Sequence, residues 1–383
     1  MNDHKMVDIY YWSKMDEDEN LAGGDIRAKY MIPELLKQSA IGGFVFTPDS
    51  ILRKEFIIKH KSLSKVLISV IFPIKLFTIA KLEKRRIRFI YCTTCYVWDT
   101  LPALTIKFFT DAKVICVSHD TPLQLEGYSF FRKNERYSIL RSLIFAAIGK
   151  LQVFLLQFIN IPIAISKFAM GFFQNLNVKN KVILSSNGIS KIAEITGNSP
   201  KHYDLVFLGR VIPRKNLQNL LLALSNHSYK RKIKLLIITN TEERFVQESI
   251  LQFLDPSLTN LTIRYSVNEE EKFKLLNFSK IYVSLSSDEN FSVATIEAAS
   301  MGNALLLSDH DFYRTIYGDS AVYVNENDLE EIWFNIVSLL EDEQRLKKFQ
   351  NSSLNIARKY LYSDVAKREM DNITSSLKQG VES

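Results

Sequence analysis

Short apolar runs alternate with helix-like patterns along almost the whole chain. The first run, at 7–12, reads as a strand, and the apolar positions over 26–38 predict a helix after it. Alternating strands and helices are typical of an α/β protein with parallel sheets. In the first half of the chain the same pattern predicts helical segments over 51–86 and 137–160, and strands at 42–46, 88–92, 113–118, 162–166 and from 181 to a turn at Asn187-Gly188.

A second series of strands and helices follows a polar stretch at 196–202, which contains Gly and Pro and is typical of a linker. The chain has 383 residues, more than one hydrophobic core usually supports. We therefore expect two α/β lobes that meet along a cleft, with ligands beyond the carboxyl ends of the strands. Long helices are expected from about Leu329, and strands of the second lobe at 204–209, 234–239, 261–265, 281–285, 304–307 and 321–324.

The charge is uneven along the chain. The net charge is +7, and residues 51–150 alone hold 18 Lys and Arg against 7 Asp and Glu. Such a basic region fits anionic lipid, a lipid-linked phosphate acceptor or nucleic acid, or it is a solvated surface without a partner. Residues 51–86, with the cluster Lys84-Arg85-Arg86, resemble a basic amphipathic segment at a membrane interface. Aromatic residues form no base-stacking pattern there, so nucleic acid is not expected.

The three cysteines, Cys92, Cys95 and Cys116, are too few for a disulfide framework and indicate a reducing compartment. Cys92 and Cys95 have the spacing of a redox or zinc pair. A zinc site needs four ligands and no second pair exists, so we interpret both as core thiols. The acidic stretch at 15–19 is unlike a signal peptide, and no segment is long and apolar enough to cross a bilayer. These features predict a cytoplasmic protein, at the inner face of the cytoplasmic membrane if the basic region binds lipid.

Two glutamates lie around a predicted helix start in the second half of the chain. Glu289 precedes a helix over 293–301 that Gly302 ends, and Glu297 lies within it. Ser292 is the expected N-cap. Free backbone N–H groups and the helix dipole make this helix start an anion site suited to a diphosphate. Carboxylates beside such a site are suited to accepting hydrogen bonds from sugar or ribose hydroxyls.

Further chemistry is expected at three strand ends. Gly209 and Arg210 follow the first strand of the second lobe, and Arg210 and Lys215 can converge on one anion and neutralise a leaving diphosphate. Gly23-Gly24, on a loop before the first helix, allows a phosphate or sugar close to the backbone. His119 follows a strand of the first lobe, where a structural role is the alternative. Neither Asp16-Glu-Asp18 nor Asp309-His-Asp311 has the context of a metal motif, so no metal or other cofactor is expected.

These residues resemble the retaining GT-B glycosyltransferases of family 4, also called glycosyltransferase group 1. Gly209-Arg210 with Lys215-Asn216 is similar to that family's Gly-Arg and Lys-Gly diphosphate motif. Glu289 and Glu297, with seven residues between them, resemble its paired glutamates, and Glu289-Asn-Phe-Ser resembles Glu-Gly-Phe-Gly. In the first lobe the features that fall in the family's order are Gly23-Gly24, His119, Ile165-Ser166 and Asn187-Gly188.

The resemblance implies a GT-B fold, with two Rossmann-like lobes whose parallel sheets face a central cleft. Residues 1–198 would bind the acceptor, 199–362 would bind the donor, and 363–383 would form a helix that packs back on the first lobe. The implied catalytic residues are His119, Arg210, Lys215 and Glu289. The implied donor-binding residues are Gly23, Gly24, Gly209, Arg210, Lys215, Glu289, Asn290, Phe291, Ser292, Val293 and Glu297.

The implied activity is transfer, with retention, of a hexose or N-acetylhexosamine from a UDP- or GDP-sugar to a glycan or lipid-linked acceptor in cell-surface polysaccharide synthesis. In these roles Glu289 contacts the donor sugar, Glu297 the ribose, and His119 orients the reacting sugar. Asn290 and Ser292 stand where the family has glycines, and 309–313 replaces a glycine-rich stretch. An inverting transferase, a nucleotide-sugar epimerase and a non-catalytic membrane-docking protein are the alternatives.

Overall fold

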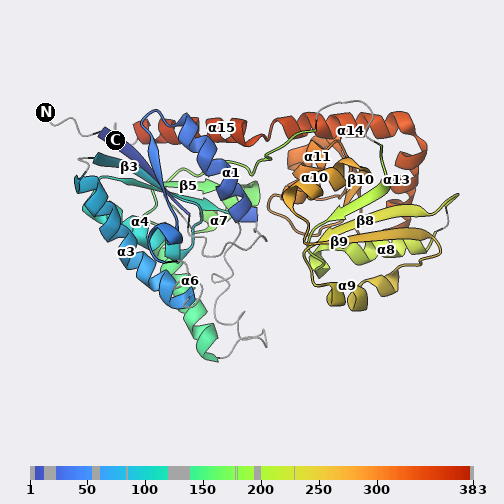
Figure 1. The fold of residues 1–383 in the computed structure, drawn as a ribbon, viewed down its shortest axis with the longest axis horizontal. Coiled ribbons are helices and arrows are strands. Elements are labelled where there is room, and N and C mark those ends of the chain that lie inside the picture. The colour runs from blue at the N-terminus through green and yellow to red at the C-terminus, as the bar shows by residue number, and fades with distance from the viewer. Residues whose placement is uncertain are drawn as a thin grey trace. The chain divides into compact units, whose positions relative to one another are not determined.

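The computed structural model describes residues 5–12, 23–53, 61–82, 85–119, 139–176, 178, 180–193, 200–227 and 229–379. They form two compact units (Figure 1). The N-terminal unit comprises Met1–Ser186 and Ser363–Ser383, and the C-terminal unit comprises Asn187–Tyr362. We predicted the boundary between 198 and 199, and the structure divides the chain earlier, after Ser186. Residues 196–199 of the linker expected at 196–202 lie outside the described residues.

The N-terminal unit is built on a parallel sheet with the strand order β2-β1-β3-β4-β5-β6. Successive residues of a strand point to opposite faces of the sheet, because the backbone is pleated. Ile9 and Cys92 face a cluster formed with α3, α4 and α7. The strands are β1 (Lys5–Tyr11), β2 (Gly43–Phe46), β3 (Arg85–Cys92), β4 (Lys113–Ser118), β5 (Ile161–Ala164) and β6 (Ile183–Leu184).

Helices cover both faces of this sheet. Figure 1 shows α1 and α15 on one face and α3 and α4 on the other, and α4 packs against both α3 and α6. A short 3-10 helix, η1 (Pro48–Ser50), follows β2. The helices are α1 (Gly23–Gln38), α3 (Lys61–Leu82), α4 (Val97–Phe109), α6 (Ile139–Leu156), α7 (Lys167–Asn175) and α15 (Tyr362–Gln379).

The C-terminal unit repeats this architecture with a parallel sheet of order β12-β11-β10-β7-β8-β9. Its core is a cluster of buried aliphatic side chains from the strands and from α8, α13 and α14. The strands are β7 (Tyr203–Leu208), β8 (Ile233–Thr239), β9 (Thr259–Tyr265), β10 (Ser279–Ser284), β11 (Ala304–Ser308) and β12 (Val322–Val324). The helices are α8 (Leu217–Ser225), α9 (Glu243–Ser249), α10 (Glu269–Asn277), α11 (Val293–Ser300), α12 (Asp311–Tyr317), α13 (Leu329–Glu341) and α14 (Glu343–Arg358), with 3-10 turns η3 (Pro213–Lys215), η4 (Leu251–Phe253) and η5 (Gly318–Ser320).

The chain leaves and re-enters the C-terminal unit at two adjacent segments. Ile189 pairs in parallel with Leu361, and the N–H of Tyr362 donates to the Ile189 carbonyl at 3.1 Å. Gly188 packs against the Tyr362 ring so closely that a Cβ atom at this position would lie only 2.7 Å from it, so only glycine fits without a shift of the ring. Both ends of this unit are therefore fastened to each other by backbone hydrogen bonds.

Two sequence predictions about the N-terminal unit are wrong in detail. The helical segment expected over 51–86 ends at Leu82, and Arg85 begins β3, because Arg85 and Arg86 pair with Lys5 and Met6 of β1 in the sheet. Lys84 and residues 54–60 lie outside the described residues. The first helix begins at Gly23, so Gly23 and Gly24 form its first turn and not a loop before it. The prediction of core thiols is confirmed, since all three cysteines are free and buried.

Candidate functional site

The order of strands in the C-terminal sheet marks the place where its loops can hold a ligand. From β7 the chain adds β8 and β9 on one side and then β10, β11 and β12 on the other. The order therefore reverses between β7 and β10, the position at which open α/β sheets bind ligands beyond the strand ends. The loops that leave these two strands carry Gly209 to Lys215 and Ser286 to Glu289. Of these residues the sequence predicted Gly209, Arg210, Lys215 and Glu289 to hold the donor.

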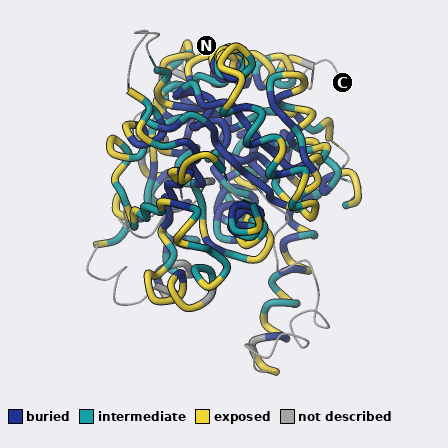
Figure 2. Tube along the Cα trace, turned by 90° about the vertical axis from the view of Figure 1, so that its right-hand side faces the viewer, coloured by how far each residue is buried: buried dark blue, intermediate teal, exposed yellow. Residues whose placement is uncertain are grey.

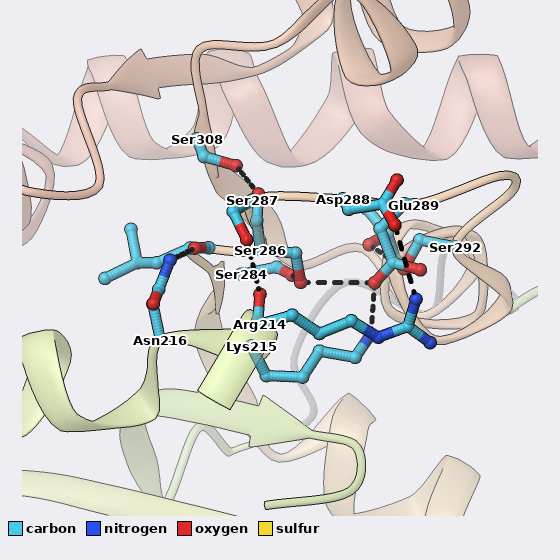
Figure 3. Close-up of polar contacts among 12 residues, drawn as sticks. Arg214, Lys215, Asn216, Ser284, Ser286, Ser287, Asp288, Glu289, Ser292 and Ser308 are labelled. Atoms are coloured by element: carbon cyan, nitrogen blue, oxygen red, sulfur yellow. Dashed lines mark hydrogen bonds and ion pairs between the residues drawn. The ribbon is translucent and has the colours of Figure 1, made fainter. Parts of the chain in front are cut away.

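These two loops are joined directly (Figure 3). The N–H of Ser287 donates to the Arg214 carbonyl at 2.9 Å, and Asn216 Nδ2 donates to the Leu285 carbonyl at 2.8 Å. Asn216 adopts a left-handed conformation with φ 49°, which asparagine tolerates better than most residues. The join fixes the first turn after β7 against the end of β10. It therefore places cationic and acidic side chains from separate segments side by side.

Lys215 and Glu289 form an ion pair at this join. Their side chains are only 13% and 11% exposed, so solvent screens the pair weakly. Arg214 lies 3.6 Å from Asp288 at the exposed edge of the same loops. Arg210 is exposed and has no ion-pair partner among the described residues. Gly209, with φ +155°, turns the chain beside the Lys215 stem, whose Cε would lie 3.9 Å from a Cβ at this glycine.

A chain of hydroxyl groups lies behind Glu289. Ser286 Oγ donates to Glu289 Oε1 at 3.1 Å, Ser284 Oγ lies 3.3 Å from Ser286 Oγ, and Tyr313 Oη lies 2.7 Å from Ser284 Oγ. Burial, together with the nearby Glu289 charge, raises the pKa of Tyr313 to about 12, so its hydroxyl stays protonated. Ser308 Oγ bonds the Ser286 carbonyl and fixes the same loop. These contacts hold the Glu289 carboxylate in one orientation.

Glu297 lies in a separate and more buried environment. Its side chain is 8% exposed, and Oε1 accepts a hydrogen bond from Lys272 Nζ at 2.6 Å. Burial raises the pKa of Glu297, the Lys272 ammonium opposes that rise, and Glu269 adds to it. The two predicted glutamates thus each have their own lysine, on different elements.

The helix that joins the two glutamates begins as predicted. Ser292 is the N-cap of α11 and Gly302, with φ +71°, follows its end. The Ser292 hydroxyl makes no capping bond and instead accepts from Thr295 Oγ1 at 2.8 Å. The first backbone N–H groups, at Val293 and Ala294, have no partner within the helix, as in any helix, and carry its positive dipole end.

Phe291 and Asn290 form the turn before this helix. Phe291 is buried, and its ring packs against Tyr360 with the ring centres 5.7 Å apart. Asn290 is half-buried. In the C-terminal unit the structure therefore brings the predicted residues from Gly209 to Lys215 together with those from Glu289 to Val293.

The N-terminal unit holds a second group of predicted residues at its own reversal of strand order, between β1 and β3. Gly24, in the first turn of α1, faces the His119 ring after β4, and a Cβ on Gly24 would lie 3.2 Å from it. Gly23 begins the same helix. A side chain at this position would press on the imidazole, and no sequence pattern predicted that Gly24 and His119 lie together.

His119 is held as a neutral imidazole. Its Nε2 lies 2.9 Å from the Thr93 carbonyl, which only accepts, so Nε2 carries the proton and Nδ1 is an acceptor. Burial and the nearby Arg27 guanidinium lower the pKa of His119 to about 3. Nδ1 is buried and has no hydrogen-bond partner among the described residues.

Arg27 is the centre of a buried polar cluster under α1. It forms an ion pair with Glu369 of α15 and donates to Tyr91 Oη at 2.8 Å, and Tyr91 Oη donates to Glu369 Oε1 at 2.6 Å. Both charged side chains are at most 2% exposed. The helix that contributes Gly24 is therefore anchored to the C-terminal helix of the chain.

Sequence reasoning missed the supporting residues of both groups, namely Arg27, Glu369, Lys272, Ser286 and Tyr313. Ser284 at the end of a strand, with Ser286 and Ser287 directly after it, was the available signal for the hydroxyl chain. The others come from distant segments that only the fold brings near. Among the described residues no three His, Cys, Asp or Glu side chains are grouped to hold a metal ion. Independence of metal stays a prediction, and Asp16 and Asp18 lie outside the described residues.

Comparison with known proteins agrees with this geometry. Residues 189–355 match the family described as "Glycosyl transferases group 1", a match that covers nearly all of the C-terminal unit and less than half of the chain. No curated protein matches the chain. Sucrose-phosphate synthase from Thermosynechococcus elongatus superimposes with a TM-score of 0.68 at 12% identity, over 98% of this chain and 100% of that one. The fold is GT-B.

Two further solved structures share the GT-B fold. HepE from Anabaena, solved in complex with UDP and glucose, has a TM-score of 0.61 at 14% identity, over 97% of this chain and 100% of that one. The N-terminal domain of Candida albicans trehalose-6-phosphate phosphatase has a TM-score of 0.67 at 11% identity, over 97% of both chains. At these identities the likeness establishes the GT-B fold that the sequence predicted.

Proposed function

We propose that this chain is a retaining glycosyltransferase that moves a hexose or N-acetylhexosamine from a UDP- or GDP-sugar to a glycan or lipid-linked acceptor. We also assign it to cell-surface polysaccharide synthesis at the inner face of the cytoplasmic membrane. One observation carries the proposal. The loops after β7 and β10 join Lys215, Glu289 and the start of α11 at the reversal of strand order, within a segment that matches the group 1 family.

The arrangement of charge supports a diphosphate between these groups. Lys215 forms an ion pair with Glu289, and its stem lies beside Gly209, which the exposed Arg210 follows in the sequence. The first N–H groups of α11 follow Glu289 in the sequence. Two cations and a helix start are suited to the negative charge that grows on a leaving diphosphate. When a diphosphate shares Lys215, the oriented Glu289 carboxylate can accept hydrogen bonds from hydroxyls of the transferred sugar.

Glu297 and His119 are also assigned contacts with the donor. Glu297, paired with Lys272, is proposed to accept hydrogen bonds from the ribose hydroxyls. In the N-terminal unit, we propose that Nδ1 of the neutral His119 accepts a hydrogen bond from a hydroxyl of the donor sugar. Gly24, which has no side chain, leaves room beside the His119 ring. In the transfer itself the bond from the anomeric carbon to the phosphate oxygen breaks, the acceptor oxygen bonds that carbon, and the departing phosphate oxygen takes the acceptor proton.

The proposal is tested by nucleotide release from a panel of UDP-, GDP- and ADP-sugars with glycan and lipid-linked acceptors. We expect release of one nucleoside diphosphate, and an NMR spectrum of the product that shows the donor's anomeric configuration. Glu297→Ala should weaken donor binding, whereas Asp288→Ala, in the same loop and exposed, should not. No release from any donor would refute the activity, and an inverted product would refute retention alone.

A further inference from the structure

Helix α6 in the N-terminal unit carries a row of exposed apolar side chains. Leu140, Ile144, Leu151, Phe154 and Phe158 are between 41% and 69% exposed. The intervals between successive members are four, seven, three and four residues. This spacing places them on one side of the helix, and Phe158 continues the row just past its end. We call this row, with the exposed Ala147 between its members, the α6 stripe.

The opposite side of the same helix is packed into the unit. Leu155 and Leu156 are buried, and Gln152 Nε2 donates to the Cys95 carbonyl at 2.9 Å. The hydrophobic residues of the α6 stripe are therefore surplus to the core of the unit. In Figures 1 and 2 the first turns of α6 extend beyond the other described helices of the N-terminal unit.

The neighbouring helix α4 extends this apolar surface. Phe108 and Phe109 at its end are 83% and 67% exposed. Lys107, next to them, donates from Nζ to the Phe158 carbonyl at 2.7 Å, so the end of α4 lies beside the end of the α6 stripe. Single exposed hydrophobic residues are ordinary, but a continuous set of this kind marks an interaction surface.

The charges of these helices identify the partner. Helices α3, α4 and α6 contain Lys or Arg at 61, 65, 75, 81, 107, 141 and 150, and their one acid, Asp99, is buried. Lys150 is exposed on α6, and Asp111 after α4 is paired with Arg86. Apolar side chains beside the exposed Lys150, on helices whose sequences are rich in Lys and Arg, match a bilayer with anionic headgroups. A second copy packed on this surface would bring like charges together.

We propose that the α6 stripe, with Phe108 and Phe109, inserts into the interfacial region of an anionic lipid bilayer and holds the N-terminal unit on it. None of the described helices is both long enough and apolar enough to cross a membrane, so α6 lies in the interface and does not span it. This places the membrane contact on α6 and α4, whereas the sequence pointed to the basic segment at 51–86.

The test is co-sedimentation of the full chain with vesicles, without donor or acceptor. Vesicles of phosphatidylcholine alone are compared with vesicles that also contain phosphatidylglycerol. The variant Leu151→Ser with Phe154→Ser removes apolar surface from exposed positions without changing charge. Its matched control is Phe245→Ser with Phe334→Ser, which alters two exposed phenylalanines of the C-terminal unit. Circular dichroism and thermal melting confirm that each variant is folded.

We expect binding to the anionic vesicles that salt weakens, about tenfold or greater loss in the α6 variant, and no loss in the control. Lys150→Gln should reduce binding to anionic vesicles only. Equal binding of the α6 variant and the unaltered chain would overturn the proposal, as would equal affinity for neutral and anionic vesicles. A dimer in light scattering that the α6 variant dissociates, without vesicle binding, would assign the surface to a second copy instead. Since no donor is present, these outcomes do not depend on the proposed transferase activity.

Discussion

The buried pair Arg27–Glu369 gives the sharpest prediction about stability. Replacing Glu369 by Ala leaves the Arg27 guanidinium, at most 2% exposed, without its carboxylate. Tyr91 then loses the acceptor for its hydroxyl as well, and a buried donor without a partner is costly. The remaining neighbours of Arg27 include the Ser186 carbonyl at 3.3 Å, which carries no charge.

The size of the effect follows from this burial. Breaking a buried ion pair by removing one partner costs about 3–5 kcal/mol, because the other charge stays in a medium of low dielectric. Total stabilities are about 5–15 kcal/mol, so the N-terminal unit should lose a large part of its own. With a urea dependence of about 2 kcal/mol per M, the unfolding midpoint of this unit should fall by roughly 1.5–2.5 M.

Tryptophan fluorescence can report on this unit alone. Trp12 and Trp98 lie in the N-terminal unit and Trp333 in the C-terminal unit, and the chain has three tryptophans in all. A Trp333→Phe background therefore removes the signal of the C-terminal unit. The matched control is Asp371→Ala, an exposed acid on the same helix, which should leave the midpoint within a few tenths of 1 M.

A second variant separates charge from packing. Arg27→Met combined with Glu369→Leu removes both charges and should recover most of the stability, since apolar replacements of a buried pair are often neutral. If Glu369→Ala shifted the midpoint no more than Asp371→Ala, the buried pair would not anchor α15. If the double variant were as unstable as the single one, the loss would come from packing and not from an uncompensated charge.

The remaining predictions concern the polar groups of the site. Lys272→Met should raise the pKa of Glu297 further and weaken donor binding about tenfold in calorimetry, with a smaller loss at higher pH, where the carboxyl ionises again; an unchanged affinity at every pH would contradict this. Ser286→Ala should lower kcat about fivefold by freeing the Glu289 carboxylate, with donor affinity little changed; a kcat equal to that of the unaltered chain would show that the hydroxyl chain is not needed. The pKa of His119 falls from 6.5 to about 3 on folding, so its contribution to stability is complete above pH 6.5 and is lost as pH falls toward 3. At pH 5 about 2 kcal/mol of the free energy of unfolding that His119 contributes should be lost. The free energy of unfolding of His119→Gln, measured by denaturation across this range, should depend less on pH than that of the unaltered chain.

The regular part of the fold could be predicted from the sequence because parallel strands buried on both faces are continuous apolar runs. The strand at 113–118 was predicted with its observed ends, and helix α11 with its N-cap and closing glycine. Arg85 and Arg86 were misplaced because three basic residues in a row look like the surface of a helix. Their place in a strand follows from their backbone pairing with Lys5 and Met6 of β1.

The candidate site was predictable where its residues are neighbours in sequence. Glu289, Ser292 and Glu297 share one segment, and their order around a helix start indicated an anion site. The partners that control these side chains and His119 are not local in sequence: Lys272 reaches Glu297 from the preceding helix, and Arg27 influences His119 from α1. Such pairings depend on how the helices pack on the sheets, and no pattern within a single segment encodes them.

The split of the N-terminal unit has a consequence for the order of folding during synthesis. The C-terminal unit is one continuous segment, Asn187–Tyr362, whereas the N-terminal unit needs Ser363–Ser383 as well. Domains usually complete folding in the order in which the ribosome makes them. Here the guanidinium of Arg27 has to wait for Glu369, near the very end of the chain, before it can be buried as an ion pair.

We therefore expect the second half of the nascent protein to become protease-resistant before the first half does. Ribosome-bound chains that stop after residue 362, extended only by an unstructured tether that clears the exit tunnel, should show resistance confined to the C-terminal unit. Chains that include α15 should show it in both units. Early resistance of the N-terminal unit in the shorter chains would mean that its sheet is stable without this helix.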